Sequence, residues 1–118
     1  MGVHRRHGGL DMDRGAIVVA VFPRAFGKPR PALVVQAEAF SPLDSVTLLP
    51  LTSDIRRPNT FRLDVLPTTS NGLRQRCQVM IDKIQTVPVD KIGQIVGRLD
   101  KTSLDRVDIA LALFLGLA

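Results

Sequence analysis

The sequence predicts a small, mainly β domain of the α+β class, a compact barrel that ends in one α-helix. Eight prolines and nine glycines interrupt short apolar runs, which is typical of strands and turns rather than of a helical bundle. From residue 100 onward, apolar side chains instead recur at helical spacing. Because 118 residues with 45% hydrophobic content can bury one modest core, a single domain is expected.

The first half of the chain contains the clearest strand signals. Residues 61–65 alternate strictly between apolar and polar side chains and should form a half-exposed strand. Residues 23–31 should form a loop, because their three prolines remove backbone donors. Three continuous apolar runs predict strands that are buried on both faces: 17–22, 32–36 and 46–51.

The second half of the chain predicts two more strands and a turn. Asn71–Gly72 is a strong turn signal. Residues 78–87 read as one strand that ends at a proline. Residues 92–99 include Gly93 and Gly97, which indicates a bent or bulged strand.

The C-terminal segment predicts a helix that begins after Asp100, a good N-cap residue. Residues 109–118 are apolar all round, so this segment should be buried on more than one side. The covering surface is either a second subunit or the sheet of the same chain. An apolar stripe at helical spacing precedes and enters this segment: Leu104, Val107, Leu111 and Phe114.

Residues 1–13 are polar and lack periodicity, so we expect a disordered tail followed by one domain at 14–118. This start has no apolar stretch for export, and no run reaches the roughly 18 apolar residues that span a bilayer. A lone cysteine, Cys77, fits a reducing compartment. We therefore expect a cytoplasmic protein.

The net charge of +5 and the pI near 10.4 suit a polyanionic partner, although a basic solvated surface gives the same values. The positive charges are concentrated in loops, where functional residues are frequent. If three loops meet at one end of the barrel, seven cations face one site: Arg24, Lys28, Arg30, Arg56, Arg57, Arg74 and Arg76.

The chain lacks the usual catalytic groups. No histidine follows residue 7, and no Cys/His cluster, P-loop or dinucleotide fingerprint is present. The carboxylates are too scattered for a two-metal nuclease site, so neither a metal nor a cofactor is expected. Cys77 has no histidine partner, and a packing role is expected for it. RNA tolerates this lack of groups, because its own 2′-hydroxyl is an internal nucleophile beside the phosphorus.

The run KPRPALVVQ at 28–36 resembles the second strand of the MazF/PemK toxin family. Further blocks resemble the family in the same order along 14–117: Arg14–Gly15, PLTS at 50–53, NGL at 71–73, DKIQTV at 82–87 and GRLD at 97–100.

The resemblance implies an SH3-like barrel of the CcdB/PemK type with a C-terminal helix, working as a homodimer. It implies a type II toxin that cleaves single-stranded RNA or mRNA without metal and leaves a 2′,3′-cyclic phosphate. It also implies a cognate antitoxin with an acidic C-terminal tail. Two alternatives remain open. A related barrel poisons gyrase, and a non-catalytic RNA-binding barrel would explain the scarcity of aromatic stacking residues.

The resemblance places the family's catalytic arginine on Arg30 and its catalytic threonine on Thr52. Arg30 lies between two prolines, which preset its direction toward a phosphate. The sequence departs from the family at Lys83, often a glutamine there, and at Gln85, often a basic residue, so either an altered sequence preference or a reduced activity is expected. The basic loops supply the expected RNA-binding residues: Arg24, Phe26, Lys28, Ser53, Arg56, Arg57, Arg74 and Arg76.

Overall fold

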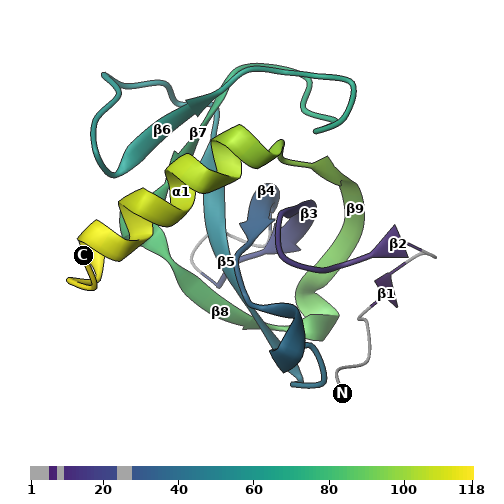
Figure 1. Ribbon diagram of the computed structural model, residues 1–118. Coiled ribbons are helices and arrows are strands. Elements are labelled where there is room, and N and C mark those ends of the chain that lie inside the picture. The colour runs from purple at the N-terminus through teal and green to yellow at the C-terminus, as the bar shows by residue number, and fades with distance from the viewer. Residues whose placement is uncertain (1–5, 8–9, 24–27) are drawn as a thin grey trace.

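The computed structural model describes residues 6–7, 10–23 and 28–118. Within these ranges a curved, seven-stranded antiparallel sheet packs against one C-terminal helix (Figure 1). Its elements are β3 (Ala16–Val21), β4 (Pro29–Val34), β5 (Ser45–Thr52), β6 (Arg62–Val65), β7 (Cys77–Met80), β8 (Gln85–Pro88), β9 (Ile92–Arg98) and α1 (Lys101–Phe114). The hydrogen-bonded order is β6-β7-β5-β4-β3-β9, and β8 also pairs with β5. The predicted mainly β fold with a C-terminal helix is confirmed.

The central strand β5 contributes to two cores, because successive side chains point to opposite faces of a sheet. Its even-numbered residues Val46 and Leu48 pack in one core, with apolar residues of β3 and β4. Leu49 and Leu51 pack in the other core, which includes Val107 of α1. Burial on both faces, as the apolar run predicts, is confirmed. Helix α1 therefore covers the odd-numbered face of β5.

The prediction of one strand over 78–87 is wrong. The 3-10 helix η2 (Ile81–Lys83) separates β7 from β8. Ile81 is fully buried, and its N–H donates to the carbonyl oxygen of Phe61 at 2.9 Å. Strand β7 pairs with the C-terminal end of β5, and β8 pairs with the N-terminal half of β5. The 3-10 helix η2 therefore divides the predicted strand into two shorter strands that both pair with β5. Two further 3-10 helices are η1 (Glu38–Phe40) and η3 (Val89–Lys91).

Strand β4 begins at Pro29, three residues earlier than the predicted start at residue 32. The N–H of Val35, directly after β4, donates to the carbonyl oxygen of Thr47 in β5. The backbone N–H groups of odd-numbered residues along this strand therefore point toward β5. Pro29 and Pro31 are also odd-numbered, and they lack an N–H only on that side. Toward β3 the ladder continues, with Arg30 opposite Ala20. Two prolines at alternate positions thus leave the hydrogen bonds on one edge of the strand intact. The predicted loop over residues 23–31 is therefore wrong for residues 29–31.

The sheet is open, because β6 and β9 at its two ends do not pair with each other. The loop between β6 and β7 packs against β9 instead, and the N–H of Arg98 donates to the carbonyl oxygen of Ser70 at 2.9 Å. The predicted Asn71–Gly72 turn is confirmed, with Gly72 at a φ of +69°. A Cβ on Gly97 would lie 2.4 Å from the Asn71 carbonyl carbon, so this approach requires glycine. Register shifts between β3 and β9 confirm the bulged strand.

Two short strands, β1 (Arg6–His7) and β2 (Leu10–Asp11), pair within the segment expected to be a disordered tail. Met12 is 2% exposed and belongs to the core of even-numbered β5 residues. Ion pairs also join Asp13 to Arg98 of β9 and Arg14 to Asp108 of α1. Packed structure therefore begins by Met12. The domain limits 1–13 and 14–118 themselves stay a prediction.

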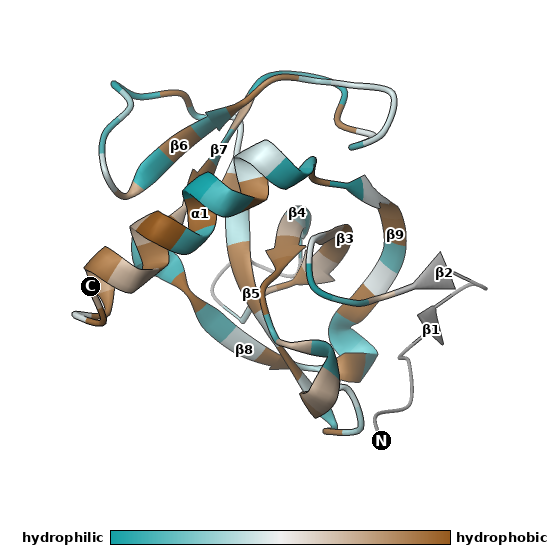
Figure 2. Cartoon of the chain, in the orientation of Figure 1, coloured by the Kyte–Doolittle hydropathy of each residue, from teal (hydrophilic) through white to brown (hydrophobic). Residues whose placement is uncertain are grey.

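Helix α1 begins as predicted, because the Asp100 carboxylate accepts a hydrogen bond from the N–H of Ser103 at 3.0 Å. Its C-terminal half is strongly apolar (Figure 2). Ala110 is buried, whereas Ile109, Leu113 and Leu117 are 63%, 50% and 77% exposed. The chain's own sheet therefore covers only one side of this segment. In the described ranges, no helix has the length and apolar character needed to cross a membrane.

Candidate functional site

An open cleft of about 460 Å³ lies beside the central strands β4 and β5, and Arg30 forms one of its walls. Pro50 of β5 lines the cleft and is even-numbered, so the cleft lies on the face of β5 away from α1. The residues that line it are Phe22, Pro23, Arg30, Pro50, Met80, Lys83 and Gln85.

The cleft combines apolar walls with positive charge. Phe22 and Pro50 are buried: Phe22 directly follows the last residue of β3, and Pro50 lies within β5. Arg30 is exposed, and in the ranges that the structure describes its guanidinium has no hydrogen bond or ion pair. Lys83 supplies a second cation, and no carboxylate is among the described lining residues. This arrangement suits an anion attached to a flat, largely apolar group.

Thr52 is the last residue of β5 and is not among the described residues that line the cleft. Because alternate residues of a strand share a face, Thr52 lies on the same face of β5 as Pro50. The β4–β5 ladder ends at Ala32 and Pro50, and Arg30 pairs with Ala20 of β3. The Thr52 hydroxyl oxygen accepts a hydrogen bond from the N–H of Asp54 at 3.1 Å. Its own proton remains available to an acceptor such as a phosphate oxygen.

A buried side chain, Gln78, holds the turn that follows Thr52. Gln78 lies opposite Thr52 on β7 and is 0% exposed. Its Oε1 accepts from the N–H of Arg56 at 3.1 Å, and its Nε2 donates to the Arg56 carbonyl oxygen at 2.6 Å. The same Nε2 donates to Asp64 Oδ1 at 2.8 Å. The carboxamide thus pairs with the backbone of Arg56 as a neighbouring strand would.

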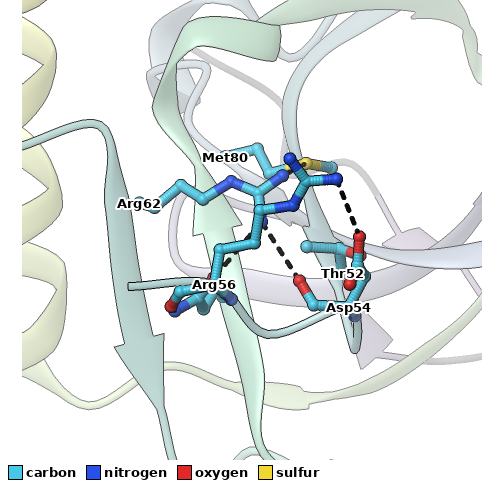
Figure 3. A network of polar contacts seen from close by, with 6 residues as sticks. Thr52, Asp54, Arg56, Arg62 and Met80 are labelled. Atoms are coloured by element: carbon cyan, nitrogen blue, oxygen red, sulfur yellow. Dashed lines mark hydrogen bonds and ion pairs between the residues drawn. The ribbon is translucent and has the colours of Figure 1, made fainter. Parts of the chain in front are cut away.

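Arg62 of β6 contacts both the turn that follows Thr52 and the side chain of Met80 (Figure 3). Its Nη1 donates to the carbonyl oxygen of Asp54 at 3.1 Å and to Gln78 Oε1 at 3.3 Å. Its Nη2 contacts Met80 Sδ at 3.6 Å, and Met80 lines the cleft. We call Asp54, Arg56, Arg62, Asp64 and Gln78 the Gln78 network. It fixes the turn after Thr52 against the wall of the cleft.

The predicted cations do not all gather in the cleft. Two of them already have carboxylate partners: Arg56 Nη2 lies 3.3 Å from Asp54 Oδ2, and Arg76 Nη2 lies 2.5 Å from Asp64 Oδ2. The expected residues Arg24 and Phe26 lie outside the described residues. The other predicted RNA-binding residues are exposed but do not line the cleft: Lys28, Ser53, Arg57 and Arg74.

Two groups near the network have shifted pKa values. The hydrogen bond from Gln78, followed by the hydrogen bond and charge of Arg76, lowers the pKa of the Asp64 carboxyl below its ordinary 3.8. Burial raises the pKa of the Cys77 thiol. A buried thiol that resists ionisation is a poor nucleophile, in keeping with a packing role. Among the described residues, no group of three His, Cys, Asp or Glu side chains is arranged to hold a metal ion.

Sequence reasoning missed the role of Gln78 and Met80. A glutamine and a methionine inside a strand carry no signal of their own, and only the fold shows what they face. Lys83 and Gln85, two positions at which the sequence departs from the family, both line the cleft with Arg30.

The family match covers most of the chain. Residues 13–115 match the model of the PemK-like, MazF-like toxins of type II toxin–antitoxin systems. The chain belongs to this family. Its similarity to the probable endoribonuclease MazF of Mycolicibacterium smegmatis is 41% identity over 108 residues, 91% of this chain and 99% of that protein.

Solved structures of MazF-like toxins share the fold. Mycobacterium tuberculosis toxin MazF-mt6 matches with a TM-score of 0.75 and 29% identity, over 87% of this chain and 98% of that one. An endoribonuclease in complex with its cognate antitoxin, from a mycobacterial species, also matches with a TM-score of 0.75. At 23% identity over 90% of this chain and 96% of that one, this second likeness concerns the fold alone. The expected family and its fold are therefore confirmed.

Proposed function

We propose that this MazF-like toxin is an endoribonuclease that cleaves single-stranded RNA, including mRNA, in the cytoplasm and thereby inhibits translation and growth. The observation that carries the proposal is the cleft, in which the exposed Arg30 guanidinium has no protein partner in the described ranges and stands among apolar walls. A relative with 41% identity bears the name of an endoribonuclease, which supports the same activity.

The chemistry follows from the substrate and the two residues. The 2′-oxygen attacks the adjacent phosphorus and the 5′-oxygen leaves, giving a 2′,3′-cyclic phosphate and a 5′-hydroxyl. Arg30 binds the nonbridging phosphoryl oxygens and stabilises the negative charge that grows on them. Thr52 donates its hydroxyl proton as a hydrogen bond to the same phosphate. An arginine keeps its protons at physiological pH, so Arg30 has no proton-transfer role.

The proposal includes two macromolecular partners. An antitoxin with an acidic C-terminal tail would bind the positive surface and block access of RNA to the cleft. A second copy of the chain would cover the exposed apolar end of α1, formed by Ile109, Leu113 and Leu117. Leu117→Asp should therefore give a monomeric or insoluble chain without RNA cleavage, measured by light scattering together with an RNA assay. A wild-type chain that is monomeric and active would contradict the dimer.

The test of the activity is incubation with a mixed-sequence RNA in EDTA, followed by mass spectrometry of the products. We expect cleavage with 2′,3′-cyclic phosphate ends. Once the cut sequence is known, an oligonucleotide with a single 2′-deoxy substitution at the cleaved position is the matched control, and it should resist cleavage. Cleavage of the deoxy control, or dependence on a divalent metal, would contradict the proposed chemistry.

A further inference from the structure

Lys83 lines the same cleft as Arg30 and is the last residue of η2. The backbone beneath it is fixed, because the fully buried Ile81 begins η2 and its N–H donates to the carbonyl oxygen of Phe61, the residue before β6, at 2.9 Å. The Lys83 side chain is 60% exposed, and its Nζ lies 3.3 Å from Asp82 Oδ2. An ammonium group therefore stands at the mouth of the cleft, on a rigid support.

RNA cleavage by the 2′-oxygen requires two proton movements. The 2′-hydroxyl loses a proton, and the departing 5′-oxygen gains one. Among the described residues that line the cleft, only Arg30 and Lys83 have side chains that carry a charge. A guanidinium keeps its protons, whereas an ammonium can donate one. The proton for the 5′-oxygen therefore has one source among the described side chains of the cleft.

We propose that Lys83 is the general acid of this cleavage, donating a proton from Nζ to the 5′-oxygen as the phosphorus–5′-oxygen bond breaks. The inference rests on the proposed endoribonuclease function. The bond from the 2′-oxygen to phosphorus forms as the bond to the 5′-oxygen breaks, and the 2′-hydroxyl proton passes to solvent water. After the products leave, Lys83 regains a proton from water. Arg30 stabilises the phosphoryl charge and remains protonated throughout.

The test compares Lys83→Met and Lys83→Arg on two substrates under single-turnover conditions. One substrate is the RNA that the wild type cleaves. The other replaces the 5′-oxygen at the scissile bond with sulfur, which leaves as a thiolate and needs no proton. Loss of a general acid should slow cleavage of the ordinary RNA by about 100-fold or more in both variants. Both variants should cleave the sulfur-containing RNA at nearly the wild-type rate.

Lys91 provides the matched control. It ends the 3-10 helix η3, follows an aspartate as Lys83 does, and is not among the residues that line the cleft. Lys91→Met should cleave both substrates as the wild type does. Arg30→Ala should be slow on both, because the sulfur substitution does not replace the stabilisation of phosphoryl charge.

Three results distinguish the possibilities. Full activity of Lys83→Arg on ordinary RNA would show that the positive charge suffices, and would overturn the role as an acid. An equal loss of rate on both substrates would overturn it as well. A wild type that cleaves neither substrate would contradict the proposed function itself, and would thus be distinct from failure of the Lys83 assignment alone.

Discussion

Two arginines near the cleft use the same side chain in different ways. Arg62 is half-buried, and its guanidinium contacts the Asp54 carbonyl oxygen, Gln78 Oε1 and Met80 Sδ. Arg30 is exposed in the cleft and has no hydrogen bond or ion pair in the described ranges. The donors of Arg62 are occupied by the fold, whereas those of Arg30 remain available to a substrate.

Arg62 thus stabilises the structure around the site, whereas Arg30 is available to bind RNA. The Gln78 network satisfies its own polar groups and fixes the turn after Thr52. In the cleft, the Arg30 guanidinium has no partner among the described residues, whereas the Lys83 ammonium pairs with the neighbouring Asp82. An arginine count along the sequence therefore overstates the charge available for RNA, because several of these side chains already have partners.

The largest effect on stability is expected from breaking the network at its centre. Gln78→Leu would leave the Arg56 backbone and Asp64 without their buried partner, and should lower the free energy of unfolding by about 2 kcal/mol or more. The turn after Thr52 would then be free to move. Because Thr52 would lose its fixed position, the cleavage rate should also fall. Urea unfolding and single-turnover RNA cleavage measure the two effects.

The matched control is Gln94→Leu, which changes an exposed glutamine of β9 and should shift the free energy of unfolding by less than about 0.5 kcal/mol. If Gln78→Leu were as stable and as active as Gln94→Leu, the network would not support the site.

Much of this fold could be predicted, but the Gln78 network could not. The doubly buried β5 and the Asp100 cap follow from local patterns, which depend on neighbouring residues alone. Gln78 acts through residues that are 14 and 22 positions away, so no local pattern reveals it. The prolines of β4 led to a predicted loop where the structure has a strand. Only the strand pairing shows toward which edge the missing N–H groups point.

The second prediction extends the comparison to the outer loops. Each unpaired cation that contacts a phosphate should contribute about 0.7 to the slope of log affinity against log salt. Arg57→Ala and Arg74→Ala should each reduce the slope by about that amount. Arg76→Ala should reduce it less, because the Arg76 guanidinium is already 2.5 Å from Asp64. Filter binding of an uncleavable 2′-deoxy-substituted RNA across a salt series measures these slopes, and identical slopes for all three variants would remove the distinction.

The smallest effect concerns pH. Because the folded protein lowers the pKa of Asp64 below 3.8, this carboxylate contributes stability above that value. The contribution is lost as the pH falls through the lower, folded-state pKa. Asp64→Asn should therefore reduce stability at neutral pH and make less difference in strong acid. Asp90→Asn, on the exposed η3, is the control, and urea midpoints measured at both pH values would show whether the Asp64 difference narrows.

The most direct test of the whole account is the single-turnover cleavage rate of Arg30→Ala in EDTA, measured beside the affinity for an uncleavable RNA. If Arg30 stabilises the charge that develops in the transition state, the rate should fall by about 100-fold to 1,000-fold or more, with little change in affinity. Thermal unfolding should match the wild type, because the exposed guanidinium has no partner among the described residues. Cleavage at close to the wild-type rate would contradict the assignment of this cleft as the active site.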